Sequence, residues 1–340
     1  MNQNYSAQFF HDLGGGRFQC DLCPHECKLQ EGQVGLCHAR AHQNGQFVSL
    51  VYGHPIGLAV DPIEKKPLFH FLPGTQILSF GTIGCNLKCP FCQNWQMSTA
   101  HASNISLDFI APELIALTAI KHQCKSVAFT YNEPTVFAEY AMDVAKHCHE
   151  QNLKTVAVTN GYINPAARKI FYQHMDAANV DLKAFTESFY HNRTGAHLQP
   201  VLNTLQYLKK ETNVWLEITT LLIPGENDDP KEIEALSQWI FKNLGANVPL
   251  HFSAFHPAYQ LMNTPSTPIK TLEKAREIAF NQGLHYVYIG NVMTADGENT
   301  HCSQCQTILI ERKGFQTVKT YLTAENHCPK CNAICAGIFL

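Results

Sequence analysis

The stretch Gly81-Thr-Ile-Gly-Cys85-Asn-Leu-Lys-Cys89-Pro-Phe-Cys92 decides the fold of this chain. Its three cysteines have the spacing C-x3-C-x2-C and follow the apolar run 77–80, which is typical of a buried strand. Three thiolates on one loop can hold three corners of a [4Fe–4S] cluster and leave its fourth iron open to a cofactor or substrate. Zinc with a fourth ligand is the alternative, but no histidine follows closely.

The composition is that of an enzyme-sized globular protein. Of the 340 residues, 45% are apolar and 16% are charged, and the formal net charge is −3. A large core is therefore expected, and a broad nucleic-acid surface is not indicated. The chain begins with polar residues and has no long apolar run, so neither secretion nor a membrane span is expected. The 14 cysteines, several of them in C-x2-C pairs, indicate metal sites in a cytoplasmic protein rather than disulfides.

Two further groups of four cysteines stand near the ends of the chain. The first comprises Cys20, Cys23, Cys27 and Cys37, with glycines nearby that allow tight turns around a metal. Zinc and an auxiliary iron–sulfur cluster both suit this group.

The second group comprises Cys302, Cys305, Cys328 and Cys331, two C-x2-C pairs on either side of strand-like segments around Gly314. It predicts a zinc ribbon or a rubredoxin-like site, with zinc expected and iron as the alternative.

Strand-like and helix-like segments alternate from residue 76 onward. Apolar runs predict strands at 76–80, 126–130, 154–159, 178–182, 214–222, 249–254 and 286–290. Amphipathic segments predict helices near 111–123, 136–150, 165–174, 198–211, 230–243 and 268–282. Repeated βα units imply a parallel sheet with helices outside, so the fold class is α/β, a partial (β/α)6 TIM-like barrel. We expect a Cys-rich segment over 1–75, the barrel over 76–295 and a metal-binding lobe over 296–340.

The segment Asp61–Gly74 is rich in proline and ends in glycine. We expect it to be irregular and to run over the surface or along the mouth of the site.

Polar side chains follow the ends of several predicted strands, where barrels of this kind place their active sites. They are Asn132, Glu133, Asn160, Asp181, Lys183 and His256. Alternation along the strand puts Asp181 and Lys183 on one side, and charges in a barrel interior need partners. We therefore expect this pair to bind each other or a cofactor.

The loop Cys85–Cys92 resembles the signature of the radical S-adenosylmethionine (SAM) superfamily, C-x3-C-x-aromatic-C, with Phe91 as the aromatic residue. The resemblance implies that the three cysteines bind a [4Fe–4S] cluster, that SAM chelates its open iron, and that reduction yields methionine and a 5′-deoxyadenosyl radical. Asn132 and Glu133 match the superfamily's amino-group-binding motif by position, although its usual Gly-Gly-Glu is Tyr-Asn-Glu in this chain. The other four polar residues are expected to help position SAM.

A narrower resemblance covers nearly the whole chain. Its motifs are 20–40, 61–74, 85–95, 131–134, 181–183 and the C-terminal cysteine pairs, which together are similar to the AmmeMemoRadiSam-system radical SAM protein family. This family lies in the branch of glycyl-radical-enzyme activating enzymes. The resemblance implies Amme-type and Memo-type partners and a reductant such as flavodoxin or ferredoxin. It does not identify the substrate. Two alternative functions remain: installation of a glycyl radical on a partner enzyme, and a metal-bound scaffold without chemistry.

Overall fold

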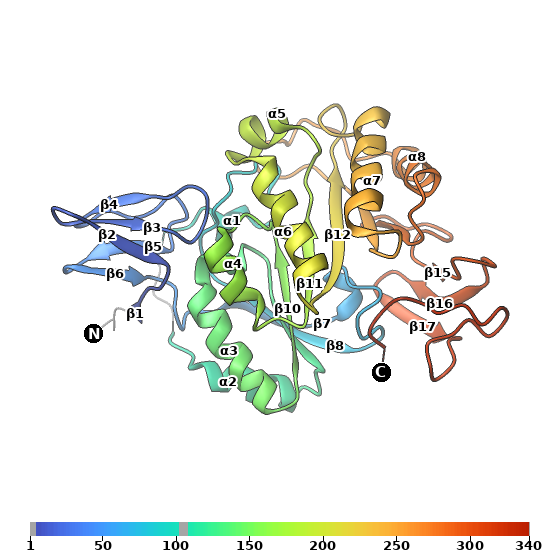
Figure 1. Ribbon diagram of the computed structural model, residues 1–340, viewed down its shortest axis with the longest axis horizontal. Coiled ribbons are helices and arrows are strands. Elements are labelled where there is room, and N and C mark those ends of the chain that lie inside the picture. Colours follow the sequence, from blue (N-terminus) through green and yellow to red (C-terminus); the bar gives the residue numbers. More distant parts are fainter. Residues whose placement is uncertain (1–4, 102–107, 340) are drawn as a thin grey trace.

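An eight-stranded sheet with the order β14-β13-β12-β11-β10-β9-β8-β7 forms the centre of the computed structural model, which describes residues 5–101 and 108–339 (Figure 1). Its strands are β7 (Ile56–Pro62), β8 (Gln76–Gly81), β9 (Ser126–Phe129), β10 (Lys154–Thr159), β11 (Ala177–Asp181), β12 (Trp215–Leu222), β13 (Leu250–Ala254) and β14 (Val287–Gly290). Strands β8 to β14 are parallel, and β7 pairs with β8 in the antiparallel sense. Because β7 and β14 are the two edges, the described part of the sheet is an open, partial barrel, which confirms the predicted fold class.

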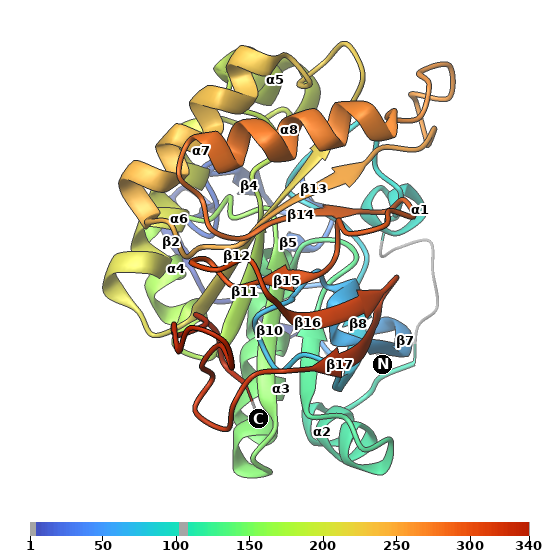
Figure 2. The same cartoon turned by 90° about the vertical axis from the view of Figure 1, so that its right-hand side faces the viewer.

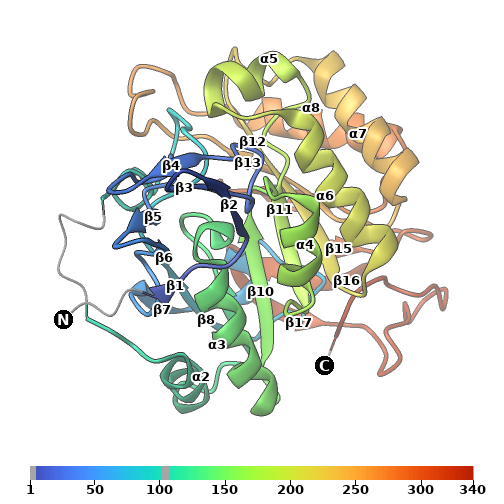
Figure 3. The same ribbon diagram turned by 60° about the vertical axis from the view of Figure 1, so that its left-hand side comes forward.

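Helices connect the parallel strands and cover the outer face of the sheet (Figures 1 and 3). They are α2 (Pro112–Lys121), α3 (Ala138–Glu150), α4 (Pro165–Tyr172), α6 (Leu198–Glu211), α7 (Pro230–Leu244) and α8 (Ile269–Asn281). Prolines open α2, α4 and α7, where a missing backbone N–H costs no helical hydrogen bond. The Asp229 carboxylate caps α7 by accepting from the Lys231 N–H at 2.8 Å. Shorter helical turns are η1 (Ile63–Lys65), α1 (Trp95–Ser98), η3 (Pro134–Phe137), α5 (Glu187–Phe189) and η4 (Tyr190–Thr194).

Two small antiparallel sheets at the N-terminus lie on one side of the barrel (Figure 3). One contains β1 (Tyr5–Ser6), β6 (Gln46–Ser49) and β5 (Arg40–Gln43), and the other contains β2 (Phe10–Gly14), β3 (Arg17–Cys20) and β4 (Lys28–Gln30). Arg40 of β5 fixes the first of these sheets to α3, because its Nη1 donates to both carboxylate oxygens of Glu139 at 2.9 and 3.0 Å. Both side chains are buried, so this pair is well shielded from water.

The C-terminal ribbon lies on the opposite side of the barrel (Figures 1 and 2). Its strands are β15 (Thr300–His301), β16 (Ile308–Lys313) and β17 (Gln316–Thr320), with the β16–β17 turn at Gly314 as predicted. Within the described residues, no helix combines the length and apolar character needed to cross a membrane.

Most of the segment Asp61–Gly74 is buried beneath the barrel, and only Lys65 and Gly74 are exposed. Its predicted course over the surface or along the mouth is therefore wrong for most of its length. The backbone N–H groups of Phe69 and His70 donate to the carboxylate of Glu217, near the start of β12, at distances of 2.8 to 3.1 Å. This end of the sheet is opposite the cysteine loop that follows β8. The charges of the segment are paired, as in the contact between Lys66 and Asp61 at 2.6 Å.

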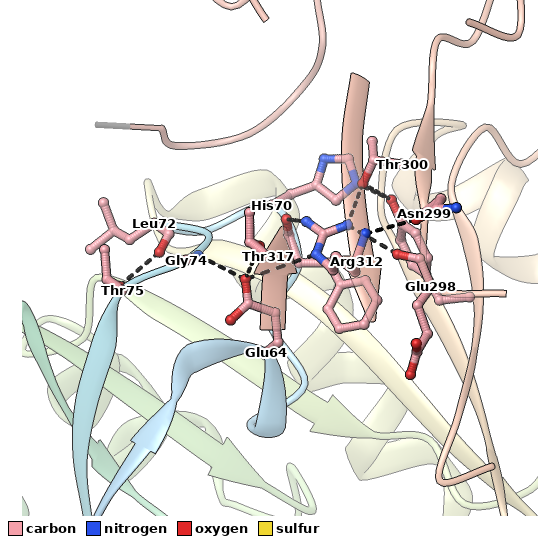
Figure 4. Close-up of polar contacts among 12 residues, drawn as sticks. Glu64, His70, Leu72, Gly74, Thr75, Glu298, Asn299, Thr300, Arg312 and Thr317 are labelled. Carbon is pink, nitrogen blue, oxygen red and sulfur yellow. Dashed lines mark hydrogen bonds and ion pairs between the residues drawn. The ribbon is translucent and has the colours of Figure 1, made fainter. Parts of the chain in front are cut away.

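The C-terminal ribbon holds this buried segment in place (Figure 4). Arg312 of β16 is fully buried, donates to the Phe69 carbonyl at 2.7 Å and lies 3.8 Å from a Glu64 oxygen. Glu64 also accepts from the Gly74 N–H at 2.7 Å and from the Thr317 hydroxyl at 2.6 Å. The ribbon and the segment therefore form one floor under the barrel.

Candidate active site

The three thiols of Cys85, Cys89 and Cys92 line one cavity of about 220 Å³ at the C-terminal end of β8. The Leu87 N–H donates to the Cys85 sulfur at 3.4 Å, and the Ser98 hydroxyl is 3.3 Å from the Cys92 sulfur. Donors of this kind stabilise thiolates that ligate iron–sulfur clusters. Burial raises the pKa of the Cys89 thiol to about 11, so binding of the cluster would release its proton. The donor set and its shared cavity therefore fit a [4Fe–4S] cluster.

Two asparagines fix the cysteine loop to the ends of neighbouring strands. Asn132, after β9, donates to the Gly84 carbonyl at 2.7 Å and accepts from the Thr82 N–H at 3.1 Å. Asn160, after β10, donates to the side-chain oxygen of Asn86 at 2.8 Å. Both asparagines also line the cysteine cavity, so they combine support of the loop with a place beside any bound cofactor.

The structure does not bring the Glu133 carboxylate into this cavity. Glu133 is fully buried, and its two oxygens accept hydrogen bonds from the Thr135 N–H and hydroxyl, from the Thr159 hydroxyl at 2.7 Å and from the Asn160 N–H at 2.7 Å. Three of these hydrogen bonds go to Oε1 and one to Oε2, and Glu133 lines neither this cavity nor the one below it. Glu133 therefore holds the ends of β9 and β10 together and orients Asn160.

Asp181 and Lys183 form the charged wall of the cavity. The Lys183 ammonium donates to the Asp181 carboxylate at 2.8 Å, and both side chains face the same cavity as the three thiols. Burial opposes the charge on Lys183, but the neighbouring Asp181 and Cys89 raise its pKa above the usual value. Lys183 is therefore a cation within the site, and it contacts one of the two carboxylate oxygens of Asp181.

His256 lies outside the cavity on the exposed segment after β13. Its ring nitrogens contact the Ser266 hydroxyl at 3.2 Å and the Asn291 carbonyl at 3.0 Å. These contacts give the ring a local structural role.

A second cavity of about 500 Å³ continues from the first toward the floor of the barrel. Asn94, Tyr131, Thr219 and Ser253 line both cavities, and none of them was among the predicted site residues. Thr219 and Ser253 could have been found from the alternation of side chains along β12 and β13, which places them on the face of the sheet that lines the cavity. Tyr131 has a left-handed backbone with φ of 71°, which turns its ring over the floor, and this placement has no clear sequence signal.

The lower wall of the second cavity comes from outside the barrel strands. It is formed by the floor segment and the ribbon, through Glu64, Lys65, Lys66, Phe69, Glu298 and Phe315. Such a volume and mixed lining are typical of small-molecule sites.

The two outer cysteine groups lie in separate parts of the fold. In the ribbon, the sulfurs of Cys302 and Cys331 are 3.5 Å apart, those of Cys305 and Cys328 are 3.6 Å apart, and all four lie within 4.8 Å of one another. A tetrahedral zinc site with Zn–S bonds of 2.3 Å places its sulfurs about 3.8 Å apart, so the ribbon fits one metal ion. The N-terminal group, Cys20, Cys23, Cys27 and Cys37, lines a separate cavity.

Comparisons with known proteins agree with this geometry. Residues 80–237 match the family model described as the radical SAM superfamily. The chain is 41% identical over 326 residues to an uncharacterized protein of Methanocaldococcus jannaschii, covering 96% of this chain and 97% of that protein. It is 25% identical to a putative glycyl-radical enzyme activating enzyme of the same organism, covering 62% of this chain and 77% of that protein.

A solved radical SAM methyltransferase from Sphaerobacter thermophilus shares the fold, with a TM-score of 0.51 and 15% identity over 65% of this chain and 68% of that chain. The chain belongs to the radical SAM superfamily and is an enzyme of that class. The class implies SAM and a [4Fe–4S] cluster as cofactors, and the ribbon implies an additional metal.

Proposed function

We propose that this enzyme cleaves SAM reductively at a [4Fe–4S] cluster held by Cys85, Cys89 and Cys92, and that it acts on a small substrate in the adjoining cavity. The observation that carries the proposal is the continuous arrangement of three thiols, an opposite-charge pair and a 500 Å³ cavity. When bound and reduced by one electron, the cluster and SAM supply a 5′-deoxyadenosyl radical that abstracts hydrogen. The residues of the chain bind, orient and shield these groups.

The Asp181–Lys183 pair is complementary to the methionyl end of SAM. A carboxylate can accept from the SAM ammonium, and an ammonium can donate to the SAM carboxylate, in charge-assisted hydrogen bonds. Asn132 and Asn160 hold the loop and offer amide groups to the same ligand. Glu133 acts through Asn160 as a positioning residue. His256 is left out of this assignment, because its ring is bound outside the cavity.

Aromatic side chains lie beside the cysteine loop. Trp95 of α1 stacks on Tyr259 with ring centroids 5.3 Å apart and planes 12° apart. Phe91 lies between the second and third cysteines, is buried and packs near Phe189 with centroids 5.9 Å apart. Of these side chains, Phe91 lines the thiol cavity and limits the access of water there, whereas Trp95 is 38% exposed and lies outside that lining.

We also propose the partners that the family resemblance suggests. These are an Amme-type and a Memo-type protein as members of one system, and a flavodoxin or ferredoxin as electron donor. A reductant is required because cleavage of SAM consumes one electron.

The test is SAM cleavage by the anaerobically reconstituted full chain. With dithionite and SAM we expect 5′-deoxyadenosine, measured by chromatography. Cys89→Ala should abolish the product, and the matched control Cys124→Ala, at a buried thiol after α2, should retain it. Absence of the product from wild-type protein that contains its full iron would overturn the proposal and favour a metal-bound scaffold.

Installation of a glycyl radical on a partner enzyme is the second candidate. It is favoured by the relatives named as activating enzymes, including a 4-hydroxyphenylacetate decarboxylase activating enzyme of Clostridium scatologenes that is 25% identical over 34% of this chain and 38% of that protein. A glycyl doublet in the electron paramagnetic resonance (EPR) spectrum of a co-incubated partner enzyme would support this candidate. SAM-dependent conversion of a small molecule without the doublet would support the first.

A further inference from the structure

His251 forms a buried pair with a carboxylate at the lower end of the barrel. Its ring nitrogen Nε2 lies 2.7 Å from a Glu217 oxygen, and both side chains are buried. Glu217 also accepts from the backbone N–H groups of Phe69 and His70 and from the Trp215 indole N–H. Burial opposes the charge of Glu217, but the hydrogen bond from His251 and these neighbours hold its pKa below the usual value. Glu217 is therefore an ionised carboxylate that is fixed in place.

This carboxylate determines which nitrogen of the His251 ring carries the proton. An ionised carboxylate only accepts hydrogen bonds, so Nε2 must hold the proton that it donates to Glu217. In the neutral ring, Nδ1 then presents a lone pair. Within the part of the chain that the structure describes, Nδ1 has no hydrogen-bond partner, and it is not sealed from solvent. His251 lines the second cavity, so this acceptor is open to a ligand there.

His251 lies in the same layer of the sheet as Asp181. Thr219 of β12 is the register partner of both Asp181 in β11 and His251 in β13. Neighbouring strands lie about 4.8 Å apart, so about 10 Å separates the Cα atoms of Asp181 and His251. Asp181 and Thr219 line both cavities, whereas His251 lines the second. A small molecule in the second cavity can therefore contact His251 at one end and reach the cofactor cavity at the other.

The other charged groups around the second cavity also favour a ligand that donates hydrogen bonds. Its lysines are already paired, because Lys65 and Lys66 bind Asp61 at 2.8 and 2.6 Å. Its carboxylates are only partly used. The Oε2 atom of Glu64 is buried without a partner, and Glu298 binds one backbone N–H through Oε2 at 2.9 Å and, among the described residues, has no contact at Oε1. These unpaired groups are acceptors, as is Nδ1 of His251.

We propose that the second cavity takes a substrate with a hydroxyl or amino group, and that His251 accepts the proton of this group at Nδ1 while Glu217 positions the ring. The assignment rests on the proposed function, since it names the substrate class of the same site. Loss of hydrogen from the carbon that bears the group makes its O–H or N–H more acidic. That bond then breaks, its electron pair stays on oxygen or nitrogen, and the proton forms a bond to Nδ1. Glu217 balances the charge of the imidazolium.

Nitrogen nuclear magnetic resonance (NMR) of the full chain tests the tautomer. The oxidised, reconstituted enzyme carries nitrogen-15 in its histidine rings and is measured at pH 8 without SAM or reductant. The ring that is lost from the spectrum of His251→Gln should have a protonated Nε2 and a bare Nδ1. In Glu217→Gln the side-chain amide can donate to Nε2, so the other tautomer should appear, which a merely structural carboxylate would not cause. A wild-type ring with its proton on Nδ1 would overturn the proposal.

Small probes test the ligand class in the same samples. Benzylamine and benzyl alcohol carry donors on a ring that suits Phe69 and Phe315 in the cavity wall, whereas benzoate carries only acceptors. Both donor probes should shift the Nδ1 signal and bind about tenfold or more tightly than benzoate. A shift with one of them alone assigns the amine or the alcohol. His122→Gln, at an exposed histidine after α2, is the matched control and should respond as the wild type does. An Nδ1 signal that none of the three probes shifts, or tighter binding of benzoate, would contradict the proposal.

A crystal structure of the wild-type enzyme soaked with benzylamine gives a second measurement that needs no variant. The probe nitrogen should lie within hydrogen-bond distance of Nδ1, and a probe bound elsewhere, or not bound, would count against the assignment. The NMR and crystal measurements use neither SAM nor reductant. A failure of SAM cleavage would therefore leave their outcome unaffected, and their failure would leave the proposed cleavage of SAM intact.

Discussion

Asp181 and Lys183 form an ion pair 2.8 Å apart in the wall of the cavity that the thiols of Cys85, Cys89 and Cys92 also line. In such a partly dry site each charge stabilises the other, and removal of one leaves the other without its partner. A zwitterionic ligand can replace these mutual contacts with two of its own. The pair is therefore stable in the empty cavity and, under the proposed function, able to exchange its mutual contact for contacts with SAM.

Asp181→Asn should weaken SAM binding about 10- to 100-fold, because a hydrogen bond to a charged group contributes about 1.5–3 kcal/mol. The measurement is equilibrium dialysis of SAM with the reconstituted, oxidised enzyme. The matched control is Asp108→Asn, an exposed carboxylate before α2, which should bind SAM as the wild type does. Equal affinity of both variants would contradict the assigned role of Asp181.

Individual site residues were predictable where their environment is local. The cysteine spacing and the alternation of Asp181 with Lys183 need only neighbouring positions in the sequence. The environment of Glu133 depends on distant positions, because Thr159 and Asn160, 26 and 27 residues away, supply two of its four hydrogen bonds. A turn motif therefore indicated a ligand-binding carboxylate where the fold has a buried structural one.

At the level of elements, the strands and helices of the barrel follow the sequence closely. Buried apolar runs and first-turn prolines mark their ends, so β8 to β14 lie at or within about two residues of their predicted ranges. The position of the floor segment 61–74 could not be predicted from its sequence, because its prolines and charges are typical of exposed loops. Its burial depends on Glu217 and Arg312, which lie about 150 and 240 residues farther along the chain. No local pattern contains these partners.

Arg312→Leu should destabilise the protein by about 3 kcal/mol or more, because it leaves buried acceptors and Glu64 with fewer partners. The guanidinium binds the Glu298 carbonyl and the Thr300 hydroxyl (Figure 4). It also binds the Phe69 carbonyl and lies over the Phe69 ring. Hydrogen exchange measured by mass spectrometry should show faster exchange at the Phe69 and His70 amides, which normally donate to Glu217.

Lys313→Leu is the control for this variant, since Lys313 is the next residue of β16 and is exposed. It removes a positive charge from the same strand without opening the floor, so exchange at the Phe69 amide should stay as in the wild type. The same exchange rates in both variants would show that the ribbon does not hold the floor.

Across the whole molecule, a chain of buried polar groups connects the ribbon to the barrel. The Arg312 guanidinium donates to the Thr300 hydroxyl at 2.8 Å, Thr300 pairs with the Tyr288 hydroxyl at 2.8 Å, and Tyr288 contacts a ring nitrogen of His70. The other His70 nitrogen lies 2.6 Å from the Ala336 carbonyl oxygen. The neutral histidine can accept at one nitrogen and donate at the other, so it satisfies both contacts.

Acid should weaken this connection. Burial lowers the pKa of His70 to about 4. The charge of Glu217 opposes this shift, whereas Arg312 and His251 add to it. The Tyr288 hydroxyl also contacts the ring. Unfolded, the histidine has a pKa near 6.5, so the unfolded state binds more protons between these values. The stabilisation is complete above about pH 6.5 and is lost as the pH falls toward 4, by up to about 3 kcal/mol.

The comparison of wild type with His70→Gln at several pH values measures this effect. Wild type should be the more stable protein at pH 7.5, and the difference in the free energy of unfolding should shrink as the pH falls to 4.5. A difference that stays constant over this range would exclude His70 as the titrating group.

The floor of the barrel also has a consequence for the range of molecules that related enzymes can accept. The thiols and the Asp181–Lys183 pair belong to the barrel, whereas Glu64, Lys66, Glu298 and Phe315 reach the cavity from segments before and after it. Evolution can therefore vary the depth and charge of the lower chamber through substitutions in these two segments. Such substitutions would leave the three thiols and the Asp181–Lys183 pair in place, so the lower chamber can change without a change in the upper one.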